Sequence, residues 1–438
     1  MTALIVRQVW QLRALRVVLV VALVLRSAVA IVAYHRQTTS APDSITYVRP
    51  VPALIATHRF DTFGAPELAR TPGYPVILAA GEVAGDRLVV TLGVQVIANC
   101  LTVFAVAVLA LAMGTGTGVA VLAAALYAVE PSSIIYVAKI LTETLFTLFA
   151  TGLLIGFTCW LRGGTRSDLV FAAICLAVGC FVRPILYYAP LVLAALGVIA
   201  WRHQGTRSRA IAHIALFLVV ALAPIVAWRV RNTIVAGYDG FAAIADVNLM
   251  EYRAAGAIAR RTGRPIADVQ SELRTQLNAD QMLRADGRVA RGHERTAIYH
   301  TMRARATDII AHDPVAIFLD ATAGAARMLF GRDTSEWAAL LAIEPLTMPW
   351  QILRLALTVV WIAMVALAVI GLVRERWTLH GLVPAVVLST YLIAVSAGPE
   401  AYSRFRLAVI PPIAVLSASG AYRISRGWGR RLARTDRS

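Results

Sequence analysis

Long apolar runs separated by short polar connections dominate the chain. A helix needs about 20 apolar residues to cross a bilayer, and such runs lie at residues 17–34, 88–111, 119–136, 140–161, 211–230, 355–373 and 379–397. Shorter apolar runs lie at residues 169–182, 185–201 and 407–422. The pattern predicts an all-α integral membrane protein with about ten transmembrane helices.

The first run has two interpretations. The small residues of "RSAVA" after a basic start are typical of a cleaved secretory signal. Arg26 interrupts the apolar stretch, however, and many further runs follow it. We therefore expect an uncleaved first helix.

Arginines in the short connections predict the orientation of the helices, because basic residues of short loops remain on the cytoplasmic side. With the N-terminus inside, alternation also places the loops 162–168, 202–210 and 374–377 and the basic C-terminal tail inside. It places residues 35–86, a short turn near 130–139 and residues 232–347 outside. Both termini are therefore expected in the cytoplasm.

Four regions follow from this orientation. Residues 1–231 form an N-terminal transmembrane module whose first outer loop is 35–86, and residues 232–347 form an outer helical segment with charges at helical spacing. Residues 348–424 form the C-terminal transmembrane helices, and residues 425–438 form a basic cytoplasmic tail. Short amphipathic pieces in the outer loops, including 315–331, are expected to lie along the membrane surface.

Composition supports the membrane assignment and narrows the partners. The chain is 58% hydrophobic and 15% charged, and its net charge is +17. Much of this charge lies beside the predicted spans, where it sets topology and contacts anionic lipids. No nucleic-acid motif accompanies it, so membrane lipids are expected partners and nucleic acid is not. All four cysteines lie in predicted spans and none in an outer loop, which argues against a structural disulfide.

Asp43 is the first acid after the first predicted span. It can cap a short helix that begins at Ser44, or it can serve chemistry at the membrane surface. The sequence around it leaves both interpretations open.

Several segments resemble the GT-C glycosyltransferase superfamily, in particular the group typified by protein O-mannosyltransferases and lipid A aminoarabinose transferases (glycosyltransferase family 39). "PDSITYVRPVPALIATHRF" and "ARTPGYPVILA" resemble the first outer loop, and "EPSSIIYVAKILTETLFTLF" resembles the second outer turn and fourth span. "FVRPILYYAPLVLA", "APIVAWRVRNTIVAG" and "GPEAYSRFRLAVIPPIAVL" resemble later turns and spans in the same order.

This resemblance implies an enzyme that transfers a sugar from a polyprenyl-phosphate carrier to a lipid, glycan or protein acceptor on the outer face of the bacterial inner membrane. It also implies that Asp43 is the catalytic acid. The group often has two adjacent acids here, whereas Ser44 follows Asp43. No cofactor is therefore predicted with certainty, and a divalent metal stays an unsupported alternative.

The chemistry of such a transfer suits the predicted positions. A carboxylate near the membrane surface can deprotonate an acceptor hydroxyl, and cations can bind the departing phosphate. Snorkelling to lipid headgroups is the alternative role of each cation. Five cations are predicted at the outer rim: Lys139, Arg183, Arg231, Arg404 and Arg406. The first four are the predicted phosphate ligands, and Arg183 and Arg231 are the preferred pair.

Four further residues are candidate substrate contacts, each with a structural alternative. Glu130 precedes Pro131 and can act as a turn residue or as a second acid. Arg70 and Tyr74 lie in the rigid bend "RTPGYP". Glu143 and Arg26 lie in apolar runs, where structural pairing is expected, and Glu143 is four residues after Lys139 and can orient it.

Two other function classes compete with the transferase. A transporter or lipid flippase would place the intramembrane charges along a path, but no related halves are apparent. A scaffold subunit without activity is the other alternative. The motifs of P-loop nucleotide binding, zinc proteases and serine hydrolases are absent from the sequence, and the histidine spacing predicts no metal site.

Overall fold

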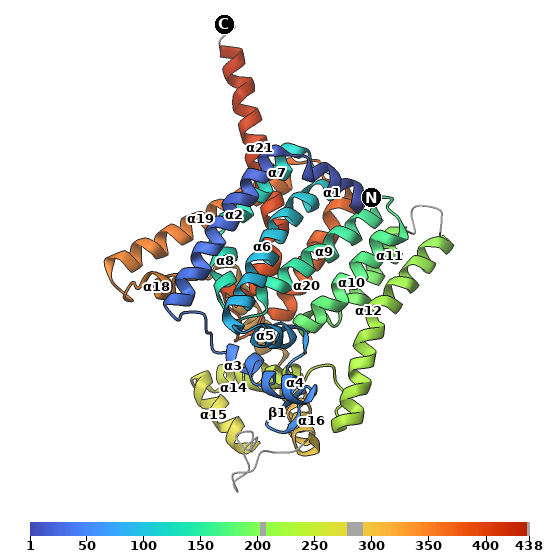
Figure 1. Ribbon diagram of the computed structural model, residues 1–438, viewed down its shortest axis with the longest axis vertical. Coiled ribbons are helices and arrows are strands. Elements are labelled where there is room, and N and C mark those ends of the chain that lie inside the picture. Colours follow the sequence, from blue (N-terminus) through green and yellow to red (C-terminus); the bar gives the residue numbers. More distant parts are fainter. Residues whose placement is uncertain (202–206, 278–291, 436–438) are drawn as a thin grey trace.

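The computed structural model describes residues 1–201, 207–277 and 292–435 and is almost entirely helical (Figure 1). Residues 202–206 of one predicted inner loop and 436–438 of the tail lie outside the described residues. The helices of the bundle are α1 (Thr2–Trp10), α2 (Arg13–His35), α6 (Arg87–Ala112), α7 (Thr117–Ala128), α9 (Glu143–Leu161), α10 (Arg166–Val182), α11 (Ala189–Trp201), α12 (Arg207–Ala236), α19 (Met348–Arg374), α20 (Leu379–Ser396) and α21 (Ile410–Thr435).

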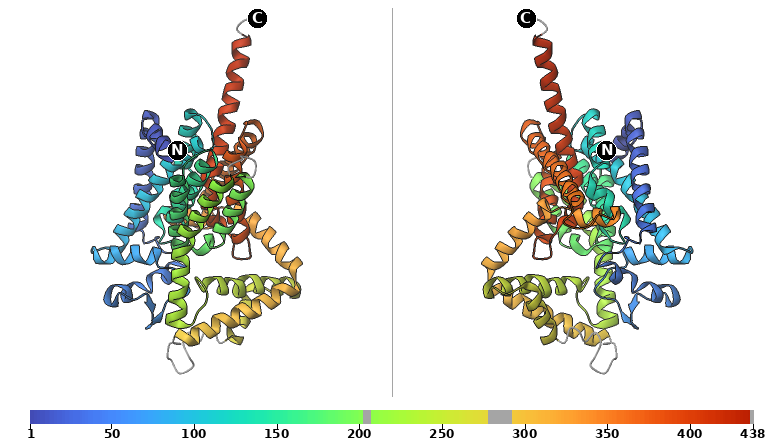
Figure 2. Two further views of the ribbon diagram at one scale, coloured as in Figure 1. Left: turned by 90° about the vertical axis from the view of Figure 1, so that its right-hand side faces the viewer. Right: turned by 90° about the vertical axis from the view of Figure 1, so that its left-hand side faces the viewer.

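Shorter elements gather at one end of this bundle, which we call the loop end (bottom of Figure 1). The first group is α3 (Ser44–Val48), α4 (Val51–Thr57), the antiparallel strands β1 (Asp61–Thr62) and β2 (Ala65–Pro66), α5 (Gly73–Val83), α8 (Pro131–Ile135), η1 (Tyr136–Ala138) and η2 (Pro184–Leu186). The second group is α13 (Ile244–Asn248), the π-helix η3 (Leu249–Ala254), α14 (Ala255–Thr262), α15 (Ile266–Gln276), α16 (Gly292–His312), α17 (Pro314–Phe330), α18 (Thr334–Leu341) and η5 (Ser403–Val409). At the opposite end, α21 extends beyond the other helices (Figure 2).

The described helices bear out an all-α membrane protein. Eight are long and apolar enough to cross a membrane, or nine if the pair α7 and α8–η1, bent by 58°, forms one broken span. α9 is almost fully enclosed, whereas α2 and α19 turn apolar side chains outward. Long helices with outward apolar faces are stable in lipid rather than in water, so the chain is a multi-pass integral membrane protein.

Residues 314–341 differ from the expected pattern. Their length and composition place them among the eight candidate spans, although they are the least apolar of the eight. The contacts of α17 are nevertheless with the loop end: the Arg327 guanidinium donates to the Gly398 carbonyl at 2.8 Å, and Arg260 pairs with Asp320. These contacts favour the expected position along the loop end over a crossing.

The break between α7 and α8 shows how buried backbone groups are satisfied inside the bundle. Arg26, fully buried on α2, donates to the Ala128 carbonyl at 2.8 Å and to Asn99 Oδ1 at 2.6 Å. Glu130 accepts from the backbone N–H groups of Ser132 and Ser133 at the start of α8. Arg26 thus caps the C-terminal end of α7, and Glu130 caps the N-terminal end of α8. Both residues therefore have a structural role.

α19 and α21 cross with their backbones in close contact. A methyl group on Gly420 would fall on the Leu367 carbonyl, and one on Gly371 would fall on the Leu416 carbonyl. Glycine is required at this crossing because small residues let membrane helices approach closely.

Gly420→Ala is expected to destabilise the protein by about 1–3 kcal/mol, because the two helices must separate. Gly93→Ala in α6 is the matched control, since no described atom beyond the adjoining helix backbone lies within 4 Å of the added carbon and alanine is the better helix former. Thermal unfolding in detergent measures both. Equal effects of the two substitutions would contradict the close crossing.

Candidate functional site

Asp43 does not cap the helix that follows it. It stands at the N-cap position of α3, but its side chain makes no capping hydrogen bond. The carboxylate pairs instead with the Arg404 guanidinium from η5 and lies 3.7 Å from Nη2 of Arg70. The capping interpretation is therefore wrong, and the side chain, 35% exposed, can be reached from outside the protein.

Glu143 anchors the same cluster from the first residue of α9. Its Oε1 lies 2.7 Å from Nη1 of Arg183 and 3.4 Å from Nε of Arg404. Both guanidinium groups also lie against the Phe405 ring, at 4.8 and 4.9 Å. Since Glu143 is only 4% exposed, its charge is compensated by these arginines rather than by water.

The predicted pairing of Glu143 with Lys139 is wrong. Lys139 lies before α9 in an extended backbone conformation, so the two residues do not share a helix face. Its Nζ binds Glu336 of α18 at 2.5 Å and the Thr38 carbonyl at 2.7 Å. Lys139 therefore connects α18 to the first loop rather than to the Asp43 cluster.

Arg70 joins Asp43 because of how α5 begins. Gly73 lies directly against the backbone of Phe181, so that any side chain there would meet its carbonyl. This contact brings the start of α5 to the end of α10, immediately before Arg183. Arg70 also donates to Tyr47 Oη at 3.1 Å and lies over that ring.

Tyr74, one turn further along, has a different position. It is fully buried and donates to Gln95 Oε1 at 2.9 Å. Gln95 in turn donates to the Val137 and Lys139 carbonyls. The geometry gives Tyr74 a packing role between α5 and α6, with no surface for a substrate.

Arg231, half of the preferred cation pair, lies outside the cluster. Its guanidinium donates to the carbonyls of Phe60 at 3.1 Å and Glu67 at 3.3 Å and packs over Trp228. These contacts hold the β1–β2 hairpin onto α12. The structure thus brings Arg183 to Asp43 but not Arg231.

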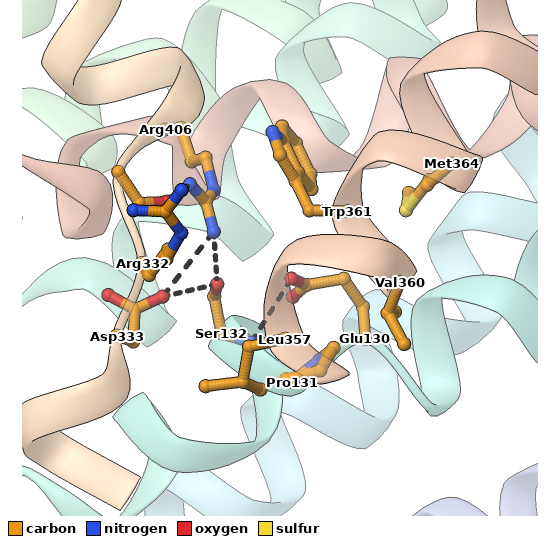
Figure 3. A pocket seen from close by; sticks show the side chains of 11 residues that line it. Glu130, Pro131, Ser132, Arg332, Asp333, Leu357, Val360, Trp361, Met364 and Arg406 are labelled. Carbon is orange, nitrogen blue, oxygen red and sulfur yellow. Dashed lines mark hydrogen bonds and ion pairs between the residues drawn. The ribbon is translucent and has the colours of Figure 1, made fainter. Parts of the chain in front are cut away.

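Arg406 belongs to a second polar network (Figure 3). Its Nη2 donates to Ser132 Oγ at 2.9 Å and lies 3.5 Å from Asp333, and its guanidinium lies 4.1 Å from the Trp361 ring centre. Ser132, Tyr136 and Ser403 donate to Asp333. Glu130 lines the same small pocket but is only 3% exposed, so it is poorly placed to contact a large substrate.

A second pocket lies beside the Asp43 cluster and has two unlike sides. Glu143, Arg183 and Arg404 form its charged side. The remaining wall, between α9, α20 and η5, consists largely of apolar side chains: Phe146, Ile185, Leu392, Phe405, Leu407 and Ala408. The cavity itself, about 10 Å³, has room for about one water molecule. An anionic group with an apolar chain would find matching partners in this lining, but its binding requires the lining side chains to move apart.

Sequence reasoning missed Tyr402 and Glu400 in the turn before η5. Tyr402 is 41% exposed, and the Arg404 guanidinium lies 4.7 Å from its ring centre. Glu400 faces Arg253 of η3 at 3.5 Å. The quoted segment "GPEAYSRFR" contains both, but only the fold reveals that this turn meets residue 43.

Electrostatics keep Asp43 ionised. Partial burial acts to raise the pKa of Asp43, but the nearby guanidinium groups, above all that of Arg404, outweigh it, so the pKa lies below its ordinary value. Glu400 behaves in the opposite way, because burial raises its pKa despite Arg253. Within the described ranges no three His, Cys, Asp or Glu side chains group as metal ligands.

Comparison with known proteins shows a similar fold. No protein-family model matches the sequence, and no curated protein matches it. A structure of the archaeal oligosaccharyltransferase AglB from Archaeoglobus fulgidus, in complex with an inhibitory peptide and a dolichol-phosphate, is 15% identical with a TM-score of 0.55. The alignment covers 99% of this chain and 52% of AglB, so the chain spans about half the length of AglB.

Two structures of ArnT from Cupriavidus metallidurans are each 13% identical. The apo form has a TM-score of 0.39, with 91% of this chain and 76% of ArnT covered. The form bound to undecaprenyl phosphate has a TM-score of 0.40, with 95% and 79% covered. The similarity to AglB shows a shared fold, and the all-α membrane architecture predicted from the sequence is confirmed.

Glu143→Gln is expected to lower the free energy of unfolding by about 3 kcal/mol, because it leaves two arginines without their buried counter-charge. Glu82→Gln is the matched control: Glu82 pairs with Arg87, but this pair is exposed and is worth at most about 1 kcal/mol. Thermal unfolding in detergent compares them. A Glu143 variant as stable as the control would contradict the anchoring role.

Proposed function

We propose that the chain is a membrane glycosyltransferase that moves a sugar from a polyprenyl-phosphate donor to a hydroxyl of a lipid, glycan or protein acceptor. The observation that carries this proposal is a partly exposed carboxylate, Asp43, held by arginines beside a pocket with a charged side and an apolar side. A polyprenyl-phosphate sugar has an anionic group and an apolar chain, which correspond to these two sides.

The proposed reaction is a single displacement with inversion. The acceptor oxygen attacks the anomeric carbon, and its proton passes to Asp43 as the general base. The bond between the anomeric carbon and the phosphate oxygen breaks, and the phosphate leaves with the electron pair. Guanidinium groups stabilise the charge that develops on this phosphate.

Arg404, Arg183 and Arg70 are the cations best placed for the phosphate. Arg404 and Arg183 line the pocket, and Arg70 borders Asp43. Arginine presents a planar fork that binds phosphate through two parallel hydrogen bonds. The apolar wall of the pocket lies between membrane helices, where the polyprenyl chain can remain in the hydrocarbon.

Topology and fold support the same assignment. The arginine-rich short loops favour a position of the loop end outside the cytoplasm, and we propose the outer face of a bacterial inner membrane for the site. The fold is similar to that of AglB, whose structure contains a dolichol-phosphate. Because the chain spans only about half of AglB, the acceptor is proposed here only as a hydroxyl-bearing class.

Asp43→Asn is expected to lower transfer about 10²- to 10⁴-fold, because the amide cannot accept the acceptor proton. The assay uses purified protein in nanodiscs and a panel of radiolabelled polyprenyl-phosphate sugars, with crude membrane lipids, glycans and peptides as acceptors. Glu82→Gln, which removes a charge at the loop end outside the cluster, serves as the control. An Asp43→Asn enzyme as active as the control would remove Asp43 as the base.

The pH profile of transfer distinguishes two acids. Since the pKa of Asp43 is lowered, Asp43 is already ionised above about pH 4, and the rate should show no acidic limb from it between pH 5 and 8. The activity that depends on this carboxylate is lost only as the pH falls through the lowered pKa. An acidic limb in this range would instead indicate a carboxyl group with a raised pKa, such as Glu400, whose pKa is raised by burial.

A further inference from the structure

Arg404 contacts the proposed base and also lines the proposed donor pocket. Its Nη2 pairs with Asp43, and its Nε faces Glu143 at 3.4 Å. The same guanidinium borders the pocket together with Arg183. A phosphate that enters this pocket therefore approaches the group that already holds Asp43.

The contacts around Arg404 are incomplete. Within the described part of the chain, Nε of Arg404 and Oε2 of Glu143 are buried without a hydrogen-bond partner. Buried polar groups are normally paired. Nε of Arg404 can therefore donate one further hydrogen bond, and Oε2 of Glu143 can accept one. Arg183 fixes Glu143 from the other side at 2.7 Å, which keeps this carboxylate in place while Arg404 moves.

Phosphate and carboxylate compete for the same kind of partner. A guanidinium fork binds either anion in the same planar geometry, and a phosphate offers more acceptor oxygens than Asp43 does. While Asp43 is paired with Arg404 and Arg70, its oxygens are engaged and it is a weak base. Release from Arg404 would raise its basicity.

We infer that Arg404 is a positioning residue that passes from Asp43 to the donor phosphate as the donor binds, and so frees the Asp43 carboxylate for the acceptor hydroxyl. The inference rests on the proposed function. It makes the reaction ordered, since the donor must bind before the base can engage the acceptor. Glu143 retains Arg404 between its two positions.

Binding of undecaprenyl phosphate tests this exchange without any transfer. Wild type, Asp43→Asn and Glu82→Gln are compared in nanodiscs. Because Asp43 competes with the phosphate, Asp43→Asn is expected to bind undecaprenyl phosphate about three- to tenfold more tightly than wild type. Glu82→Gln should bind within about twofold of wild type, because its charge is exposed and screened. Asp43→Ser repeats the comparison if Asp43→Asn does not fold.

A double-mutant cycle assigns the gain to Arg404. In the Arg404→Gln background, Asp43→Asn should give no gain, because the shared cation is absent. An equal gain in both backgrounds, or binding by Asp43→Asn no tighter than by wild type, would overturn the exchange and leave the proposed function standing. Failure of wild type to bind undecaprenyl phosphate would overturn both.

Discussion

The ion pairs of Glu143 determine the arrangement of the candidate site. A carboxylate buried at the start of α9 is stable only if cations compensate its charge, and Arg183 and Arg404 reach it from α10 and η5. These helices are thereby held at a fixed separation, and the pocket lies between them. Arg404 then meets Asp43 from the first loop, so one buried charge organises three separate parts of the chain.

The same constraint shapes the interior of the bundle. Where α7 ends and α8 begins, backbone groups would be unsatisfied in an apolar environment. Arg26 and Glu130 satisfy them from the two sides of the break. Charged residues inside apolar runs therefore have two roles in this protein. Some bind backbone groups at a helix break, and others pair with charged side chains beside a pocket.

Hydropathy was sufficient to predict the all-α membrane architecture, because the bilayer imposes a minimum length on every span. The span count was less accurate: about ten were predicted, whereas eight or nine of the described helices are long and apolar enough to cross a membrane. Asp43 was also accessible as a candidate, through its position after the first span together with the family resemblance. The pairing of Asp43 with Arg404 was not accessible, since the meeting of residues 43 and 404 depends on how α2, η5 and the loops pack. The pairing of Lys139 with Glu143 failed for a local reason: α9 begins at Glu143, so helical spacing does not apply to residue 139.

Proximity to the membrane surface does not by itself identify the cations of a phosphate site. The groups that each cation already binds, and the cost of releasing them, are more informative. Arg231 holds the backbone carbonyls of Phe60 and Glu67, and turning it toward a ligand would release the hairpin. Arg404 holds a partly exposed carboxylate, which water and a neighbouring arginine can solvate when it is released. The sequence prediction preferred Arg231 to Arg404, but the contacts of Arg404 can be exchanged at less cost to the fold, and that is the property a transient phosphate requires.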